Sequence, residues 1–185
     1  MRFLLPLSDP AAADAERVGA KAANLAALAQ AGLPTPGGCC LTAAAYRRQI
    51  AHLGLTDAVR DYAEADPVVQ RRLAVEIRLK LYQGDIAPEI SAEILAAWRE
   101  QTKPLAARSS ALIEDRADTS FAGQFESFLG ISDETEFLTA LRACWAALWS
   151  TNARRSMAQH GLAPPTPRWP CSFSRSLPRP PRAAA

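Results

Sequence analysis

The sequence predicts a mixed α/β (α+β) fold with a helical N-terminal region and a disordered C-terminal tail. Three observations predict it. Apolar residues recur at helical spacing through much of residues 1–103. Residues 104–165 change to short apolar segments with period-two alternation, followed by one more helix. Residues 166–185 show neither period, and seven of the chain's 14 prolines lie at or beyond Pro164, so this segment is expected to be disordered.

Composition is that of one ordinary globular domain. The chain has 185 residues, 49% hydrophobic and 22% charged, with a net charge of +2 and a mean hydropathy of −0.08. No run of eighteen apolar residues exists, which argues against a membrane protein. The N-terminal apolar run is broken at Pro6 and lacks a full signal-peptide pattern, so a cytoplasmic location is expected.

Cysteine and histidine spacing gives no sign of a metal site or a catalytic triad. The four cysteines include the adjacent pair Cys39 and Cys40, and none is spaced as CxxC. The histidines, His52 and His160, have no partner pattern. We therefore assign no metal ligand and no catalytic residue.

The helical part begins and ends on recognisable signals. Residues 3–7 read as a short strand, and a helix follows with its apolar residues on one face until Gly32 ends it. Cys39, Cys40 and Leu41 are expected to form a brief buried strand. Further helices are expected after Thr42, over residues 67–82 and after Pro88.

The segment from Arg108 to Gln124 is the richest in candidate chemistry. It is a polar loop between two expected strands, with Arg108 at its entrance, hydroxyls inside and Gly123 near its exit. A guanidinium donates two parallel hydrogen bonds to phosphate oxygens, and a glycine lets backbone approach a ligand closely. The alternative is a surface hairpin in which Arg108 forms a structural ion pair.

A second candidate lies at an expected helix start, where Gly19 is followed by Lys21. Backbone N–H groups at a helix N-terminus and an ammonium together attract anions. No Walker motif is present, and an ordinary surface lysine is the alternative.

Taken in order, four segments resemble the N-terminal ATP-binding domain of the phosphoenolpyruvate synthase and pyruvate phosphate dikinase family, which rifampicin phosphotransferases share. They are residues 18–25, 32–46, 108–115 and 120–124, supported by residues 144–149 and Arg154. The resemblance implies a partial ATP-grasp-like fold in which Lys21 and Arg108 contact ATP phosphates. It also places Gly123 and Ser127 at the nucleotide, with Glu114 and Asp115 ordering the loop.

The same resemblance implies an activity. Such enzymes split ATP to AMP and phosphate and pass a phosphoryl group through a histidine to pyruvate or a drug hydroxyl. The second half of the ATP-grasp site, with its expected Mg²⁺ ligands, and the histidine domain have no counterpart in this chain. The prediction is thus an ATP-binding fragment of a phosphotransferase, inactive alone, whose partners are ATP and the downstream domains if these are encoded separately.

Residues 166–185 raise a separate hypothesis. The run from Trp169 to Ser174 is what codons for the family's next strand, Met-Ala-Val-Leu-Val-Gln, yield when read one base later, so we interpret the tail as an out-of-frame peptide. The alternative is a genuine Pro/Arg tail that binds an acidic partner or an SH3-like groove.

A rival from another functional class is a non-catalytic protein-interaction module that uses the Trp145/Trp149 helix or the tail. The alternative for the two tryptophans is core packing, because they lie on the apolar stripe of their helix. Nucleic-acid binding is disfavoured, because the basic excess is confined to the tail, which has four arginines and no acid.

Overall fold

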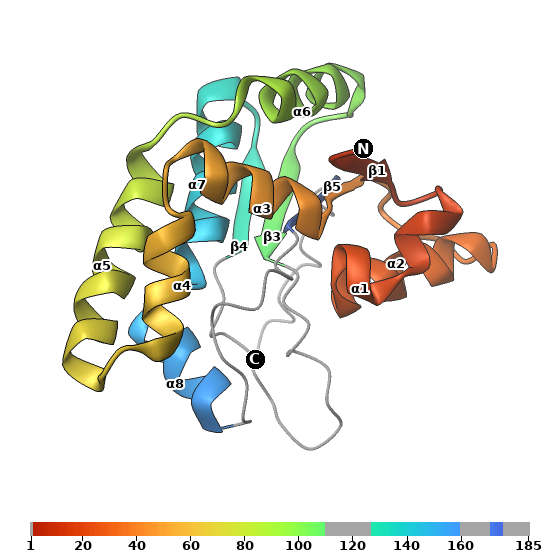
Figure 1. Ribbon diagram of the computed structural model, residues 1–185. Coiled ribbons are helices and arrows are strands. Elements are labelled where there is room, and N and C mark those ends of the chain that lie inside the picture. Colours follow the sequence, from red (N-terminus) through yellow and green to blue (C-terminus); the bar gives the residue numbers. More distant parts are fainter. Residues whose placement is uncertain (1, 110–126, 160–170, 176–185) are drawn as a thin grey trace, which may run out of the picture.

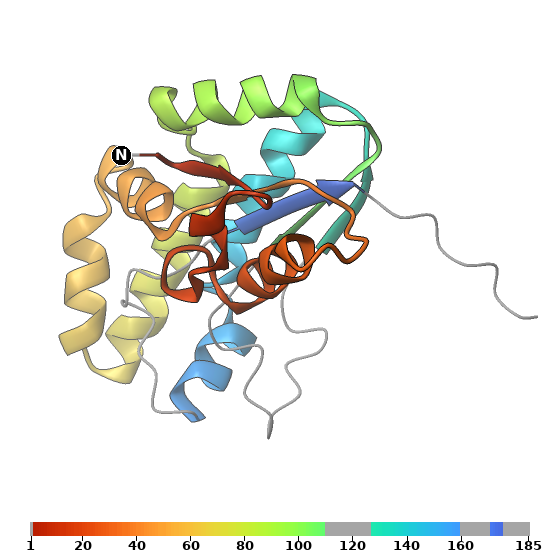
Figure 2. The same ribbon diagram turned by 90° about the vertical axis from the view of Figure 1, so that its right-hand side faces the viewer.

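The computed structural model describes residues 2–109, 127–159 and 171–175 and shows helices packed on both faces of one antiparallel sheet (Figures 1 and 2). The five strands are ordered β1-β2-β5-β3-β4. In chain order the elements are β1 (Leu4–Pro6), the 3₁₀ helix η1 (Pro10–Ala13), α1 (Ala15–Val18), α2 (Ala20–Gln30), β2 (Cys39–Leu41), α3 (Ala43–His52), α4 (Thr56–Glu64), α5 (Pro67–Gln83), α6 (Pro88–Glu100), β3 (Leu105–Ser109), β4 (Ser127–Ile131), α7 (Glu134–Ala147), α8 (Thr151–Gln159) and β5 (Cys171–Arg175).

The two faces of the sheet bury different cores, because successive side chains of a strand point to opposite faces. On one face, Leu105, Ala107 and Phe173 join the larger core with side chains of α3 to α8. On the other face, Leu5 and Cys40 pack with η1, α1 and α2. Figure 1 shows α4, α5 and α7 on one side of the sheet and α1 and α2 on the other.

Side-chain caps fix where several helices begin. The carboxylate of Asp66 accepts hydrogen bonds from the backbone N–H groups of Val68 and Val69 at 2.8 and 3.1 Å, and Pro67 occupies the first turn of α5. Asp133 caps α7 in the same way, through the N–H of Glu136 at 3.0 Å. Each cap contributes about 1 kcal/mol to stability.

The expected mixed α/β fold is confirmed, with one change of detail in the helical part. The strands expected over residues 3–7 and 39–41 are present as β1 and β2. The helix expected to run from Val18 is divided at Gly19, whose φ of 79° lies outside the helical region, so that α1 ends there and α2 begins.

The tail prediction was wrong over Cys171–Arg175, which form β5 in the middle of the sheet rather than disordered chain. β5 pairs with β2 on one side and with β3 on the other. The Phe173 side chain is fully buried and meets the Phe137 ring edge to face at 5.0 Å. This burial outweighs the absence of a period-two pattern, and the rest of 166–185 lies outside the described residues.

Gly38 lies tightly against β5. A Cβ atom on Gly38 would stand 2.2 Å from the carbonyl oxygen of Phe173, and its φ of 121° is one that side chains disfavour. The glycine pair before β2 therefore serves both the turn and the close approach of two backbones.

Among the helices that the structure describes, none is long and apolar enough to cross a membrane.

The adjacent thiols of β2 are buried, and burial raises their pKa values. The pKa of Cys39 rises to about 11 through desolvation and then through the charge of Glu100. Desolvation likewise raises the pKa of Cys40 to about 12, with smaller effects from Cys39 and Asp9. Both thiols are thus neutral and weakly nucleophilic near neutral pH.

The raised thiol pKa values predict that the protein loses stability in alkaline solution. Below about pH 9 both states keep their thiol protons, whereas between about pH 9 and 11 only the unfolded chain releases them. The free energy of unfolding should therefore fall as pH rises through this window. Urea denaturation at about pH 8 and about pH 10 measures the fall.

A Cys39→Ala/Cys40→Ala variant is the control for other groups that titrate in this range. Its free energy of unfolding should fall less between the two pH values than that of the parent chain. Equal falls in both proteins would show that the two thiols do not carry the effect.

Candidate functional site

A single row of residues crosses the middle of the sheet. Cys40 of β2 is paired with Ser172 of β5, Ser172 with Arg108 of β3, and Arg108 with Ser127 of β4. Paired residues on neighbouring antiparallel strands share a face of the sheet. Because the Cys40 side chain packs on the face of α1 and α2, Arg108 and Ser127 belong to that face as well.

Lys21 approaches the same face from a helix. It lies in the first turn of α2, where Gly19 is the N-cap residue, and it is exposed. Ala22, Ala23 and Ala26 form the buried face of α2, which packs on Leu5 and Cys40. The register places β3 two strand spacings, roughly 10 Å, from β2. The structure thus brings the helix that carries Lys21 and the strand that carries Arg108 to one side of the sheet.

The Arg108 side of β3 and β4 carries exposed side chains and is not covered by any of the described helices at these positions. Arg108 and Ser127 are exposed at the ends of their strands, and Leu129 on the same face is 63% exposed. Leu129 is paired with Ala106, so an apolar area lies next to the guanidinium and the hydroxyl. An arginine, a hydroxyl and an apolar area together suit a ligand that has both an anionic and an apolar part.

Ser109 does not join this face. Strand alternation directs it to the opposite face from Arg108, where it is 3% exposed. Its Oγ atom has no hydrogen-bond partner within the described part of the chain. Ser109 is therefore not among the hydroxyls that a ligand on the Arg108 face could meet.

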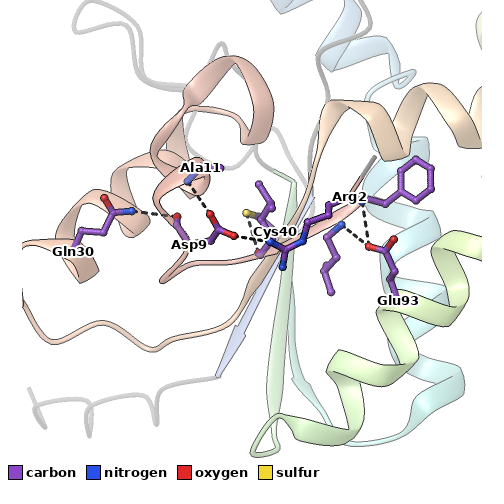
Figure 3. A network of polar contacts seen from close by, with 9 residues as sticks. Arg2, Asp9, Ala11, Gln30, Cys40 and Glu93 are labelled. Carbon is purple, nitrogen blue, oxygen red and sulfur yellow. Dashed lines mark hydrogen bonds and ion pairs between the residues drawn. The ribbon is translucent and has the colours of Figure 1, made fainter.

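Hydrogen bonds of Asp9 and Glu93 fix the strand on which α2 rests (Figure 3). The Asp9 carboxylate accepts from the Arg2 guanidinium and from the N–H of Ala11, both at 2.9 Å. The amide of Gln30, the last residue of α2, donates to the Asp9 carbonyl at 3.2 Å. These bonds hold α2 and β1 in one arrangement.

Glu93 of α6 fixes the other end of β1. Its carboxylate accepts the N–H groups of Phe3 and Leu4 at 3.1 and 2.9 Å. Sequence reasoning missed Glu93, because nothing in the pattern of α6 distinguishes it from an ordinary surface glutamate. It also missed Gly38, for which the doubled glycine before a strand was an available signal.

Three residues expected near the nucleotide, and the two histidines to which no role was assigned, are not brought together with Arg108 by the described part of the structure. Gly123, Glu114 and Asp115 lie outside the described residues. His52 is described, and it ends α3, which packs on the opposite face of the sheet from Arg108. His160 lies outside the described residues.

The rival site on α7 does not fit the structure. Trp145 and Trp149 are 0% and 3% exposed, and the Trp149 indole donates a hydrogen bond to the Tyr46 hydroxyl at 2.8 Å. Tyr62 meets the Trp149 ring edge to face at 5.2 Å. Both tryptophans are therefore core residues, and the rival interpretation of their helix as a partner-binding surface is not supported.

No group of three or more His, Cys, Asp or Glu side chains that suits a metal ion occurs within residues 2–109, 127–159 and 171–175.

An exposed arginine on one face of the sheet, with a helix start packed on the same face, has the chemical features that anion sites use. Comparison with known sequences makes the assignment specific. Residues 15–165 match the family described as "Pyruvate phosphate dikinase, AMP/ATP-binding domain", and the chain belongs to this family. The resemblance seen in the four sequence segments is confirmed.

Three relatives illustrate the range of the family. The chain is 33% identical to a phosphoenolpyruvate synthase of Aeropyrum pernix over 74% of its own length and 18% of the relative's. It is 36% identical to a phosphoenolpyruvate synthase of Neisseria meningitidis, over 76% and 20%. It is 31% identical to a rifampicin phosphotransferase of a Streptomyces species, over 87% and 19%. The chain thus spans about a fifth of the length of these relatives.

Proposed function

We propose that this chain binds ATP on the open face of β3 and β4, with Arg108 and Lys21 contacting phosphate oxygens and Ser127 donating a further hydrogen bond. The main support is the row of paired residues across β2, β5, β3 and β4, which places Arg108 and Ser127 on the same face of the sheet as α2. The description of the matching family as an AMP/ATP-binding domain supports the same ligand. Gly123 is proposed to contact the nucleotide from the adjoining segment.

The two cations suit phosphate oxygens in different ways. A guanidinium donates two parallel hydrogen bonds in a fixed plane, whereas an ammonium is a compact charge on a flexible stem. Arg108, at the end of a paired strand, is the more rigidly placed, and Lys21 extends from a helix start whose backbone dipole also favours negative charge. Cations held on two separate elements stabilise the charge that develops when a phosphoryl group moves.

We propose that this domain serves an enzyme that transfers a phosphoryl group from ATP, through a phosphohistidine, to pyruvate or a similar acceptor. The names of the relatives support this reaction class. The chain alone is proposed to bind ATP without turning it over. His52, the histidine that the structure describes, ends α3, which packs on the opposite face of the sheet from Arg108.

We also propose a domain division in which 1–103 is the helical part, 104–165 the phosphate-binding part and 166–185 an out-of-frame peptide. The family match ends at residue 165, before β5, which supports the last boundary. Resequencing the coding DNA from codon 160 tests it. Another forward frame that continues the family is expected; the absence of one would make the tail authentic.

Protection of Lys21 from an amine-reactive reagent tests ATP binding. Lys21 and Lys80 are both exposed, but Lys80 lies on α5, on the opposite side of the sheet, and is ion-paired to Glu76 at 3.1 Å. ATP should slow the modification of Lys21 severalfold and leave that of Lys80 unchanged. Equal modification of Lys21 with and without ATP would contradict the proposed site.

A further inference from the structure

An apolar groove lies between α5 and α7, on the side of the sheet away from Arg108. It has a volume of about 490 Å³, and its floor is formed by Phe128 of β4 and by alanines of α7. α5 and α7 pack side by side, and β4, the edge strand, lies next to α7 (Figure 1). The residues that line the groove include Val75, Arg78, Leu79 and Tyr82 of α5 and Ala143 and Ala147 of α7.

The α5 wall of the groove is an exposed apolar stripe. Val75, Leu79 and Tyr82 are 65%, 51% and 48% exposed, and Val68, one heptad before Val75, is 69% exposed. Residues at spacings of three, four and seven share one face of a helix. α5 therefore carries two apolar faces, one buried in the core and one facing solvent. A surface helix of a monomeric domain usually has only the buried apolar face, and its other side is polar.

The α5 side of the groove carries an excess of positive charge, and Arg78 itself lines the groove. α5 carries Arg71, Arg72, Arg78 and Lys80 against a single acid, Glu76, which is already paired with Lys80. Among the described residues neither Arg72 nor Arg78 forms an ion pair or a hydrogen bond. A surface with this charge favours an acidic partner.

We propose that this groove is a docking site for an acidic amphipathic helix of another polypeptide. Its leucine-type side chains would pack on Val75, Leu79 and Tyr82, while its carboxylates would pair with Arg72 and Arg78. The small side chains Ala143 and Ala147, one turn apart on α7, let the backbone of such a helix approach closely.

A second copy of this chain fits the groove less well than an acidic helix does. Two copies that pair through the same face would bring the arginines of both α5 helices into one interface, and like charges at an interface are unfavourable. The proposed occupant is therefore complementary in charge, not identical.

Fluorescence anisotropy with the full 185-residue chain tests the proposal. The probe is a labelled helical peptide of about 18 residues, with leucines at i, i+4, i+7 and i+11 and glutamates beside them. It should bind the parent chain, and binding should weaken as salt rises. A peptide of the same composition with the leucine spacing broken should bind at least tenfold more weakly.

Two matched variants separate the groove from general stickiness. Leu79→Ser should weaken peptide binding about tenfold or more, whereas Leu33→Ser, at a similarly exposed leucine outside the groove, should leave it unchanged. Circular dichroism spectra and urea midpoints of both variants should match those of the parent, because both side chains are half exposed.

Three results would overturn the proposal. They are no peptide binding, equal binding by both variants, or binding that is insensitive to the order of the leucines. Sedimentation equilibrium tests whether a second copy of the chain occupies the groove. A dimer that Leu79→Ser abolishes would assign the groove to self-association instead. ATP protection of Lys21 is independent of this experiment, so either proposal can fail without the other.

Discussion

Replacement of Phe173 by alanine is expected to lower the free energy of unfolding by about 3–5 kcal/mol, the usual cost of removing a large buried aromatic side chain. Phe173 is fully buried, contacts Phe137, and belongs to the strand that joins β2 to β3. Its loss would leave a cavity and would weaken the attachment of the β1–β2 half of the sheet to the β3–β4 half. Urea denaturation followed by circular dichroism measures the change.

Phe173→Leu is the matched control, because it keeps most of the apolar volume. It should cost less than about 1.5 kcal/mol beyond the loss of the ring contact with Phe137. A Phe173→Ala variant that unfolds within about 1 kcal/mol of the parent would mean that β5 is not part of the stable core.

The second large effect concerns nucleotide affinity. Arg108→Ala should weaken ATP binding by about tenfold to a hundredfold, since hydrogen bonds to a charged group contribute roughly 1.5–3 kcal/mol. The free energy of unfolding should be almost unchanged, because the Arg108 side chain is exposed and packs against no core. Isothermal titration calorimetry gives the affinity.

Two further variants show whether the geometry of the guanidinium matters. Arg108→Lys keeps the charge and loses the planar pair of donors, so its affinity should fall between those of the parent and Arg108→Ala. Arg72→Ala removes an exposed arginine from α5, on the other side of the sheet, and should leave the affinity unchanged. An equal loss in Arg72→Ala and Arg108→Ala would indicate a general charge effect and no specific site.

Much of the fold could be predicted from local signals. Asp66 with Pro67, and Thr42 and Asp133, mark helix starts that the structure shows, and Gly32 follows the end of α2. β2 was recognisable because Cys39 to Leu41 form an apolar run after a glycine-rich turn. These features depend on neighbouring residues, which a sequence displays directly.

The features that were missed depend on distant residues. β5 is a strand because it pairs with β2 and β3 and because Phe173 packs against Phe137. The sequence of residues 171–175 alone gives no sign of these distant contacts. The burial of Trp145 and Trp149 was anticipated only as one of two alternatives. The bond from Trp149 to Tyr46, a residue of α3, decided between them.

The candidate site was partly predictable for the same reason. Residue type alone marked Arg108 and Lys21 as candidates for phosphate binding. Their common face follows only from the register of β2, β5 and β3, which contains the strand that the sequence did not predict. Ser109, next to Arg108 in sequence, proved to lie on the opposite face.

Hydrogen exchange of the 185-residue chain with and without saturating ATP tests the central claim most directly, because it reports both halves of the proposed site at once. The account predicts slower exchange at the start of α2 and along β3 and β4, with no change in α5. Protection confined to one of the two segments, protection in α5 alone, or no change anywhere would contradict an ATP site formed jointly by Lys21 and Arg108.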